Sequence, residues 1–268
     1  QVVVFSENYG YTYKYMYIYK TSKKSILFDE SGDTRHDLLS LYLQHNPNWT
    51  RKELRDIALN MIIAGRDTTR ALLGWFFVCI SDRPDILKKI IAEIDAIGAS
   101  DITYDQVHNK LHYINCVLLE TLRLFPSVPA LARVAKQDVQ LPVIGDEKVG
   151  YIIRKGDICT VHNYTIGRST KFWGPNATEF DPMRWSEQGL NTAPPHVFPH
   201  FNINPRLCLG RQFALMEAQI FVFYFFKNFR FRPLHSEKPT YTVGLILNLK
   251  DGYPIILSGA NEKKETSA

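Results

Sequence analysis

The chain has 268 residues, of which 45% are hydrophobic and 22% are charged, and its 32 basic and 27 acidic side chains give a formal net charge of +5. This hydrophobic content excludes a disordered or fibrous protein, and the length fits one large domain or two small ones. We interpret the mild basic excess as a solvated surface, with an acidic partner or a membrane surface as the alternative, and no motif indicates a nucleic-acid ligand.

The first twenty residues differ from the rest, because tyrosine alternates with other side chains over residues 11–20. Such alternation is typical of a strand with one aromatic face. Every residue of that stretch is also encoded by codons made almost wholly of A and T, which favours an artefact of the gene model as a second interpretation. We therefore predict that residues 1–20 are an atypical segment.

Hydrophobic spacing and end signals predict the helices of the first half. Apolar residues recur at helical spacing within residues 33–45. Thr50 and Glu53 form a capping box before a long apolar helix that runs to about Ser81. The apolar run at residues 71–80 is shorter than the roughly 18 residues of a membrane span. Two further helices are expected, over residues 84–98 and 111–125.

In the second half, the sequence pattern changes from long helices to short strands and irregular segments. Short strands are predicted at residues 130–135, 149–153 and 157–161, the last two joined through Lys155–Gly156. Residues 173–200 are rich in Pro, Gly and Asn and indicate a long irregular loop, which is usually functional. The remaining elements are a helix that is apolar on nearly every side, at 211–229, and strands at 241–249 and 254–257. The fold class is therefore mainly α with small β-sheets.

The cysteines are the first candidates for chemistry, and they stand at positions 79, 116, 159 and 208. No CxxC pair occurs, so a zinc ribbon or a thioredoxin-like pair is not supported. Cys79 and Cys116 lie in apolar helical runs and are predicted to be buried. Cys208 precedes a helix start and has Arg206 and Arg211 as neighbours, which favour a thiolate, a soft ligand for iron. An ordinary free thiol is the alternative.

A polar block interrupts the long helix at residues 64–69, Ala-Gly-Arg-Asp-Thr-Thr. Gly65 opens a notch, and the hydroxyl of Thr68 can bond the carbonyl four residues earlier and bend the helix. An acid, Asp67, beside a hydroxyl at such a notch suits proton delivery through water. A simple helix bend is the alternative.

Two further blocks carry charges that could pair. Glu120 and Arg123 share one helix face, among leucines that favour burial. Arg184 lies in a proline-bounded loop and can present a planar fork to a carboxylate. An exposed ion pair and an ordinary loop arginine are the alternatives.

Taken in order, these blocks resemble the motifs of the cytochrome P-450 family of heme-thiolate monooxygenases. Residues 64–69 are similar to its AGxDTT motif, 120–123 to its ExxR motif, 180–185 to its arginine-bearing loop, and 201–210 to its cysteine loop. Residues 163–168, 172–175 and 210–215 are most similar to the fatty-acid and alkane terminal hydroxylases. Asn204 stands where the family has glycine, and we expect it at positive φ, which asparagine tolerates.

The resemblance implies a heme with Cys208 as the axial metal ligand and with Arg206, Arg133, Phe201 and Gly210 as further heme-binding residues. It implies proton relay by Asp67 and Thr68 and a structural triad of Glu120, Arg123 and Arg184. The substrate pocket would be lined by Val128, Ala130, Leu131, Val243 and Leu245. The implied reaction inserts one oxygen atom from dioxygen into a C–H bond of a hydrophobic substrate, with NADPH as electron source through a reductase partner.

Family members are much longer than this chain, so residues 21–259 are expected to be the C-terminal, heme-binding part of the domain and residues 260–268 a polar tail. The resemblance places a longer parent protein at the endoplasmic reticulum membrane, with its anchor outside this chain. One alternative is an inactive truncation that binds no heme, and another is a heme-thiolate isomerase or dehydratase. Intact Asp67 and Thr68 favour the monooxygenase over the isomerase. The histidine pairs 108/112 and 196/200 do not form an HExxH zinc site.

Overall fold

The computed structural model describes residues 2–3, 27, 32–98, 100–143, 150–186 and 193–260. By its contacts the chain divides into two compact units, Ser6–Asp67 and Gln1–Phe5 with Thr68–Ala268. The tyrosine-rich stretch at 11–20 and residues 261–268 of the tail lie outside the described residues. The predicted domain limits, 21–259, stay a prediction.

In the described part of the first unit, two helices begin at side-chain caps. Helix α3 (Leu38–His45) starts where the Asp37 carboxylate accepts the Ser40 N–H at 3.0 Å. Helix α4 (Arg51–Ile80) begins in this unit and continues into the second. Thr50 Oγ1 accepts the Glu53 N–H at 3.2 Å, and the Glu53 carboxylate accepts the Thr50 N–H at 2.8 Å, which confirms the predicted capping box.

The second unit contains most of the helices. Helix α5 starts at Pro84 and ends before Gly98, whose φ of 64° closes it as predicted. A short helix over 104–110 was not predicted, because seven residues carry too little periodicity. Two 3-10 turns give the segment 173–200 more structure than the expected irregular loop. The helices are α5 (Pro84–Ile97), α6 (Tyr104–Lys110), α7 (His112–Leu124), α8 (Asn163–Ile166), α9 (Thr170–Trp173), η1 (Pro182–Trp185), η2 (Pro199–Phe201) and α11 (Arg211–Asn228).

All strands pair antiparallel in small sheets. Three form one sheet, in the order β1 (Val2–Val3), β9 (Ile255–Gly259) and β6 (Phe229–Pro233). The other sheets are the pairs β2 (Leu131–Val134) with β5 (Ile158–Val161), β3 (Val139–Gln140) with β4 (Ile152–Ile153), and β7 (Tyr241–Val243) with β8 (Leu247–Leu249). The turn at Lys155–Gly156 therefore joins strands that pair with different partners. The single strand expected at 241–249 is a hairpin that turns at Gly244.

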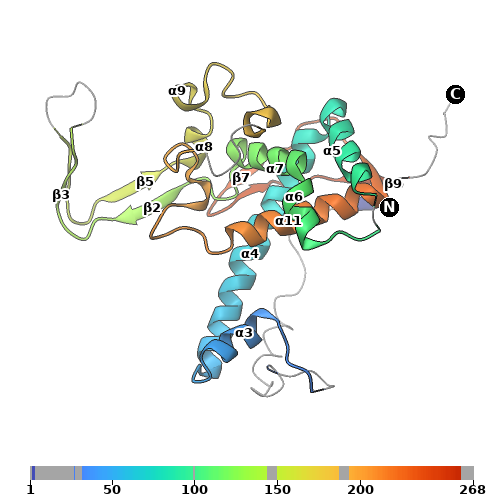
Figure 1. Ribbon diagram of the computed structural model, residues 1–268. Helices are drawn as coiled ribbons and strands as arrows, with labels where there is room; N and C mark the ends of the chain where they lie inside the picture. Colours follow the sequence, from blue (N-terminus) through green and yellow to red (C-terminus); the bar gives the residue numbers. More distant parts are fainter. Residues whose placement is uncertain are drawn as a thin grey trace. The chain divides into compact units, whose positions relative to one another are not determined.

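The core of the second unit is built around α7, which is buried at ten positions, among them Glu120 and Arg123. It contacts α5, α11, α8 and η1, and Figure 1 shows α5, α6, α7 and α11 grouped together. Cys79 and Cys116 are buried, as predicted. Helix α11 is buried along one face, whereas its first turn, with Phe213, is exposed. The predicted class, mainly α with small sheets, is confirmed.

None of the described helices has the length and apolar character that crossing a bilayer requires.

Candidate active site

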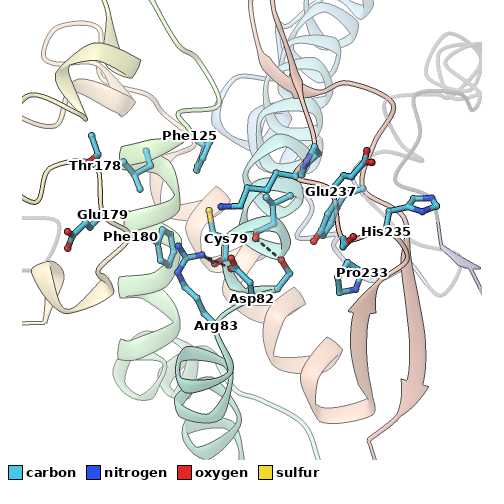
Figure 2. A pocket seen from close by; sticks show the side chains of 17 residues that line it. Cys79, Asp82, Arg83, Phe125, Thr178, Glu179, Phe180, Pro233, His235 and Glu237 are labelled. Carbon is cyan, nitrogen blue, oxygen red and sulfur yellow. Dashed lines mark hydrogen bonds and ion pairs between the residues drawn. The ribbon is translucent and has the colours of Figure 1, made fainter. Parts of the chain in front are cut away.

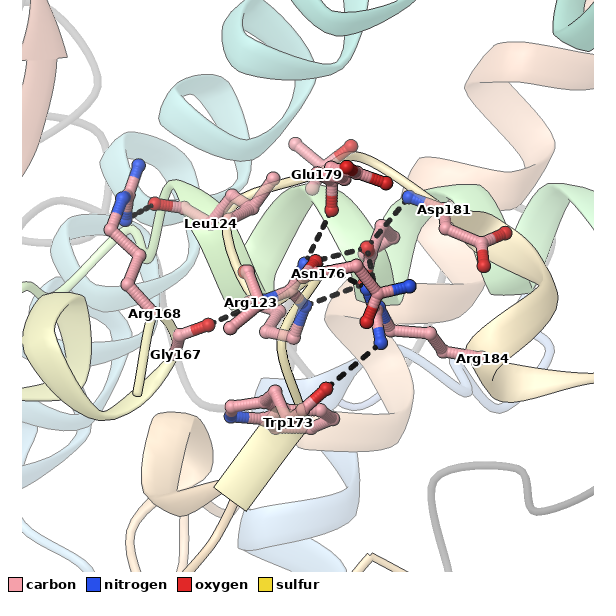
Figure 3. A network of polar contacts seen from close by, with 12 residues as sticks. Arg123, Leu124, Gly167, Arg168, Trp173, Asn176, Glu179, Asp181 and Arg184 are labelled. Carbon is pink, nitrogen blue, oxygen red and sulfur yellow. Dashed lines mark hydrogen bonds and ion pairs between the residues drawn. The ribbon is translucent and has the colours of Figure 1, made fainter. Parts of the chain in front are cut away.

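Glu120 on α7 is a wholly buried carboxylate that takes part in an extended polar network. Figure 3 shows Arg123, Asp181 and Arg184 of this network. The two oxygens of Glu120 each accept from Arg123, at 2.7 Å from Nε and at 2.7 Å from Nη2. Both side chains are wholly buried. Such a bidentate pair is one of the strong charge-assisted contacts of proteins. The pair occurs because the two residues lie three apart on one helix face.

Every N–H of the Arg123 guanidinium has an acceptor. The two N–H groups of Nη1 donate to the carbonyls of Gly167 and Ala177. The N–H of Nη2 that does not reach Glu120 donates to the carbonyl of Glu179 at 2.8 Å. Guanidinium has five N–H groups, so the buried cation is fully satisfied. The long segment that follows α8 is thereby fixed to α7.

Arg184 of η1 also reaches Glu120. Its Nε lies 3.4 Å from a Glu120 oxygen, and its other nitrogens donate to the carbonyls of Trp173 at 3.2 Å and Asn176 at 2.6 Å. The Nε contact is an ion pair rather than a directed hydrogen bond. The structure therefore brings Glu120, Arg123 and Arg184 together.

Sequence reasoning missed three donors around this network. Trp185 Nε1 donates to Glu120 at 3.0 Å, and the Asp181 N–H donates to it at 2.8 Å. Asn163, wholly buried at the start of α8, donates from Nδ2 to the Val128 carbonyl at 2.9 Å. Trp185 closes the 180–185 block and Asn163 opens the 163–168 block, so membership of a matching motif was the signal that could have found both.

Gly167 shows how closely the 163–168 segment approaches α7. A Cβ added to Gly167 would collide with the carbonyl oxygen of Arg123. Only glycine can occupy a backbone position with so little space. Arg168, the next residue, donates to the Leu124 carbonyl and lies over the Tyr164 ring at 3.7 Å.

Cys208 lies in the loop between η2 and α11. Its N–H donates to the Phe201 carbonyl at 2.8 Å, and its carbonyl accepts from the Arg211 N–H at 3.4 Å, so the thiol stands immediately before the α11 start. The Cys208 side chain is exposed. Large apolar side chains are exposed beside it in sequence: Ile203 (48%), Leu207 (44%), Leu209 (81%) and Phe213 (64%).

The expectation of positive φ at Asn204 is wrong. The left-handed residue of this loop is Asn202, with φ 64°, and its Oδ1 accepts the Ile203 N–H at 3.1 Å. Asn204 precedes Pro205 through a cis peptide bond. A residue before proline is restricted to extended backbone, so the left-handed turn position falls elsewhere, at another asparagine.

The two arginines predicted beside a heme are both exposed, in contrast to Arg123 and Arg184. Arg133 lies on β2 with Cys159 of β5 as its cross-strand partner, and its Nη1 donates to the Ala132 carbonyl at 2.7 Å. Among the described residues, neither Arg133 nor Arg206 pairs with a carboxylate. Their charges are therefore available to an anionic ligand. Gly210, also predicted at the heme, has open space where a Cβ would stand.

Asp67 and Thr68 are consecutive, half-buried residues of α4, and the helix is continuous through Gly65. The Thr68 carbonyl accepts from the Ser127 hydroxyl at 2.8 Å. The predicted pocket residues lie close to Ser127 and Leu247 in sequence. Val128, Ala130 and Leu131 are half-buried, and Val243 and Leu245 are 69% and 82% exposed.

A cavity of about 640 Å³ lies elsewhere in the second unit, and Figure 2 shows its charged lining. Cys79, Asp82 and Arg83 line one part, and His235 and Glu237 another. None of the predicted site residues lines it. Burial raises the pKa of the Cys79 thiol to about 12 and that of Cys116 to about 11. Both buried thiols are therefore poor thiolate ligands.

His200 is a half-buried titratable residue whose two ring nitrogens are both buried. Its ring stacks on Phe198 at 4.0 Å, and neither ring nitrogen has a hydrogen-bond partner among the described residues. Burial lowers the pKa of His200 to about 3, and the charge of Arg123 acts in the same direction. The Arg123 backbone lies near the ring and partly opposes this shift, without the geometry of a hydrogen bond.

The first prediction concerns acid stability. The folded pKa of His200 lies below the unfolded value of 6.5, so the unfolded chain binds the extra proton and stability is lost as pH falls from 6.5 toward 3. At pH 5 the loss is about 2 kcal/mol, from 1.5 pKa units at about 1.36 kcal/mol each. His200→Phe, which keeps the stacking, should remove this loss. Urea unfolding at pH 7 and pH 5 measures it, and an equal loss in both proteins would contradict it.

The second prediction concerns Arg184. Arg184→Ala removes one partner of a buried ion pair and should destabilise the fold by about 3–5 kcal/mol. The matched control is Arg154→Ala, because Arg154 is 73% exposed and lies 4.0 Å from Asp138. That change should stay within about 0.5 kcal/mol. Equal free energies of unfolding for the two variants would show that the Glu120 contact contributes nothing.

Comparison with known proteins agrees with these features. The profile of the family Cytochrome P450 matches residues 10–256. Cytochrome P450 CYP94D109 of Paris polyphylla is 33% identical over 230 residues, which cover 82% of this chain and 44% of that protein. Cytochrome P450 94A2 of Vicia sativa is 33% identical over 248 residues, 88% of this chain and 45% of that protein.

A third relative, Cytochrome P450 86B1 of Arabidopsis thaliana, is 29% identical over 258 residues, 90% of this chain and 45% of that protein. The chain thus spans about half the length of the relatives it matches. The family profile covers most of the chain, including all four sequence blocks. The chain belongs to the cytochrome P450 family.

Proposed function

We propose that this chain is the heme-binding part of a heme-thiolate monooxygenase, with Cys208 as the iron ligand. The observation that carries the proposal is the exposed thiol of Cys208 at the start of α11, within a run of exposed apolar side chains. A soluble protein rarely leaves so many large apolar side chains uncovered in one segment without a ligand or partner. A flat, apolar macrocycle with a central metal is a ligand that would cover them.

The donor set fits this group. A single exposed thiol at the start of α11 offers one soft ligand for iron. Exposed Arg133 and Arg206 would hold the carboxylates of the macrocycle, because neither pairs with an acid among the described residues. Phe201, whose carbonyl accepts the Cys208 N–H, would pack against the same ligand, and Gly210 would leave room for it.

When bound, a thiolate-ligated heme supplies oxygen activation. The role of the chain is then to deliver protons and to bind a substrate. Asp67 and Thr68 would transfer protons from water at the α4 polar block. Val128, Ala130, Leu131, Val243 and Leu245 would form an apolar lining for the substrate. Electrons would come from NADPH through a reductase partner.

The substrate class we propose is a long-chain fatty acid or alkane. Its support is the resemblance of residues 163–168, 172–175 and 210–215 to terminal hydroxylases, together with the apolar character of the five lining residues. The 163–168 segment contacts one of the proposed lining residues, because Asn163 donates to the Val128 carbonyl. A longer protein that contains this chain would act at the endoplasmic reticulum membrane.

The third prediction tests the iron ligand. The heme-loaded, reduced chain should show the thiolate-type Soret band with carbon monoxide, and Cys208→Ser should abolish it because an alcohol is not a thiolate donor. Cys159→Ser is the matched control, since Cys159 is the only other cysteine with an accessible side chain among the described residues. Retention of the band in Cys208→Ser would exclude the assignment, and no band in the unaltered chain would favour a non-binding truncation.

The fourth prediction tests proton delivery. Thr68→Ala should leave heme content unchanged and slow product formation by roughly a hundredfold, the lower range of what a positioned proton donor contributes to a rate, so that the product formed per NADPH falls. Thr69→Val is the control, because the Thr69 hydroxyl is buried without a hydrogen-bond partner among the described residues. Equal yields per NADPH in the Thr68→Ala and unaltered proteins would restrict Thr68 to a structural role.

A further inference from the structure

Ser127 joins three segments that are far apart in sequence. It lies between the end of α7 and the start of β2 and is 7% exposed. Its hydroxyl donates to the Thr68 carbonyl of α4 at 2.8 Å, and its carbonyl accepts the N–H of Leu247 on β8 at 3.0 Å. One buried serine therefore uses its side chain and its backbone to hold α4 and β8.

A second contact closes this arrangement into a ring. The Leu247 carbonyl accepts from Trp75 Nε1 at 2.9 Å, and Trp75 lies on α4 two turns after Thr68. The ring thus runs from Thr68 to Ser127, to Leu247, to Trp75 and back along α4. Leu247 and Trp75 are also buried, at 0% and 2% exposure, so water cannot replace these bonds without opening the structure.

Neighbouring contacts stiffen the ring. The Trp75 indole stacks on Phe125 with centroids 4.2 Å apart and an interplanar angle of 8°. Arg70 donates to the Asn248 side chain at 3.1 Å. At Gly74, a Cβ would come within 3.0 Å of the Leu249 side chain, so α4 and β8 approach closely.

The proposed pocket residues lie next to two members of this ring in the sequence. Val128, Ala130 and Leu131 begin one residue after Ser127, and Val243 and Leu245 precede Leu247 within four residues. The carbonyl of Thr68, the proposed proton donor, accepts one of the hydrogen bonds of the ring. The two bonds made by Ser127, together with the Trp75–Leu247 bond, therefore link both lining segments to Thr68.

We propose that Ser127 is a positioning residue of the substrate pocket, which fixes the two lining segments against Thr68 of α4. The proposal deepens the proposed function and rests on it. Ser127 itself does not act on the substrate. It acts through the Thr68 carbonyl and the Leu247 amide.

The test deletes the hydroxyl alone, with Ser127→Ala in the full chain. Thr121→Val is the matched control, because the Thr121 hydroxyl is also buried and donates to a carbonyl at 2.8 Å, but within its own helix, to Val117. Ser127→Thr restores a hydroxyl. The first readout is amide hydrogen exchange over residues 241–249, which needs no heme. The second is the binding of dodecanoic acid to the heme-loaded chain, followed by the Soret shift.

Ser127→Ala should speed exchange at Leu247 about fivefold, the size of one net neutral hydrogen bond, and raise the dissociation constant for dodecanoic acid by a similar factor. The heme content should not change, Thr121→Val should alter neither readout, and Ser127→Thr should restore both. Unaltered exchange and affinity in Ser127→Ala, or the same changes in Thr121→Val, would overturn the proposal. If the unaltered chain takes up no heme, the proposed function fails, and the exchange readout still decides whether the Ser127 hydroxyl stabilises the backbone bond from Leu247 of β8.

Discussion

The second unit depends on the burial of one ion pair, Glu120 with Arg123. Two charges without access to water cost several kcal/mol each, and the cost is offset only when every donor and acceptor has a partner. Those partners do not come from α7 itself. They are the carbonyls of residues 167, 177 and 179, the Asp181 N–H and the Trp185 indole. A long segment with little regular structure must therefore fold onto α7, because the charges are satisfied in no other way.

The same constraint reaches the cysteine loop through aromatic contacts. Trp185, which donates to Glu120, packs edge-on against Phe198 with centroids 4.9 Å apart, and Phe198 stacks on His200 at 4.0 Å. Phe201 follows at once, and its carbonyl accepts the Cys208 N–H. The buried carboxylate and the exposed thiol are thus ends of one continuous set of contacts. Loss of the ion pair is expected to change the conformation of the Cys208 loop, even though neither Glu120 nor Arg123 contacts Cys208.

Sequence reasoning predicted the elements whose causes are local. The capping box at Thr50, the start at Pro84 and the end at Gly98 depend on neighbours within four residues, and all three are correct. The pairings of β2 with β5 and of β6 with β9, and the contacts of Glu120 with Asp181, Arg184 and Trp185, join residues more than twenty apart, and no local pattern specifies them. The prediction of a positive φ at Asn204 was wrong for a different reason. Family glycine suggested a left-handed residue there, while the restriction imposed by Pro205 pointed away from it.

Helix α7 is connected to the candidate site by two routes. Its last two turns carry the ion pair, which leads through Trp185 and Phe198 to the Cys208 loop. Its C-terminal end leads within three residues to Ser127, which holds the segments proposed to line the pocket. Because α7 is buried at nearly every position, it has little freedom to move one end relative to the other. The proposed metal ligand and the proposed pocket therefore share a rigid support, although no side chain of α7 has to touch either ligand. Among the described residues, Glu120 and Arg123 are wholly buried charges that lie away from the exposed Cys208 thiol, where water does not screen their attraction.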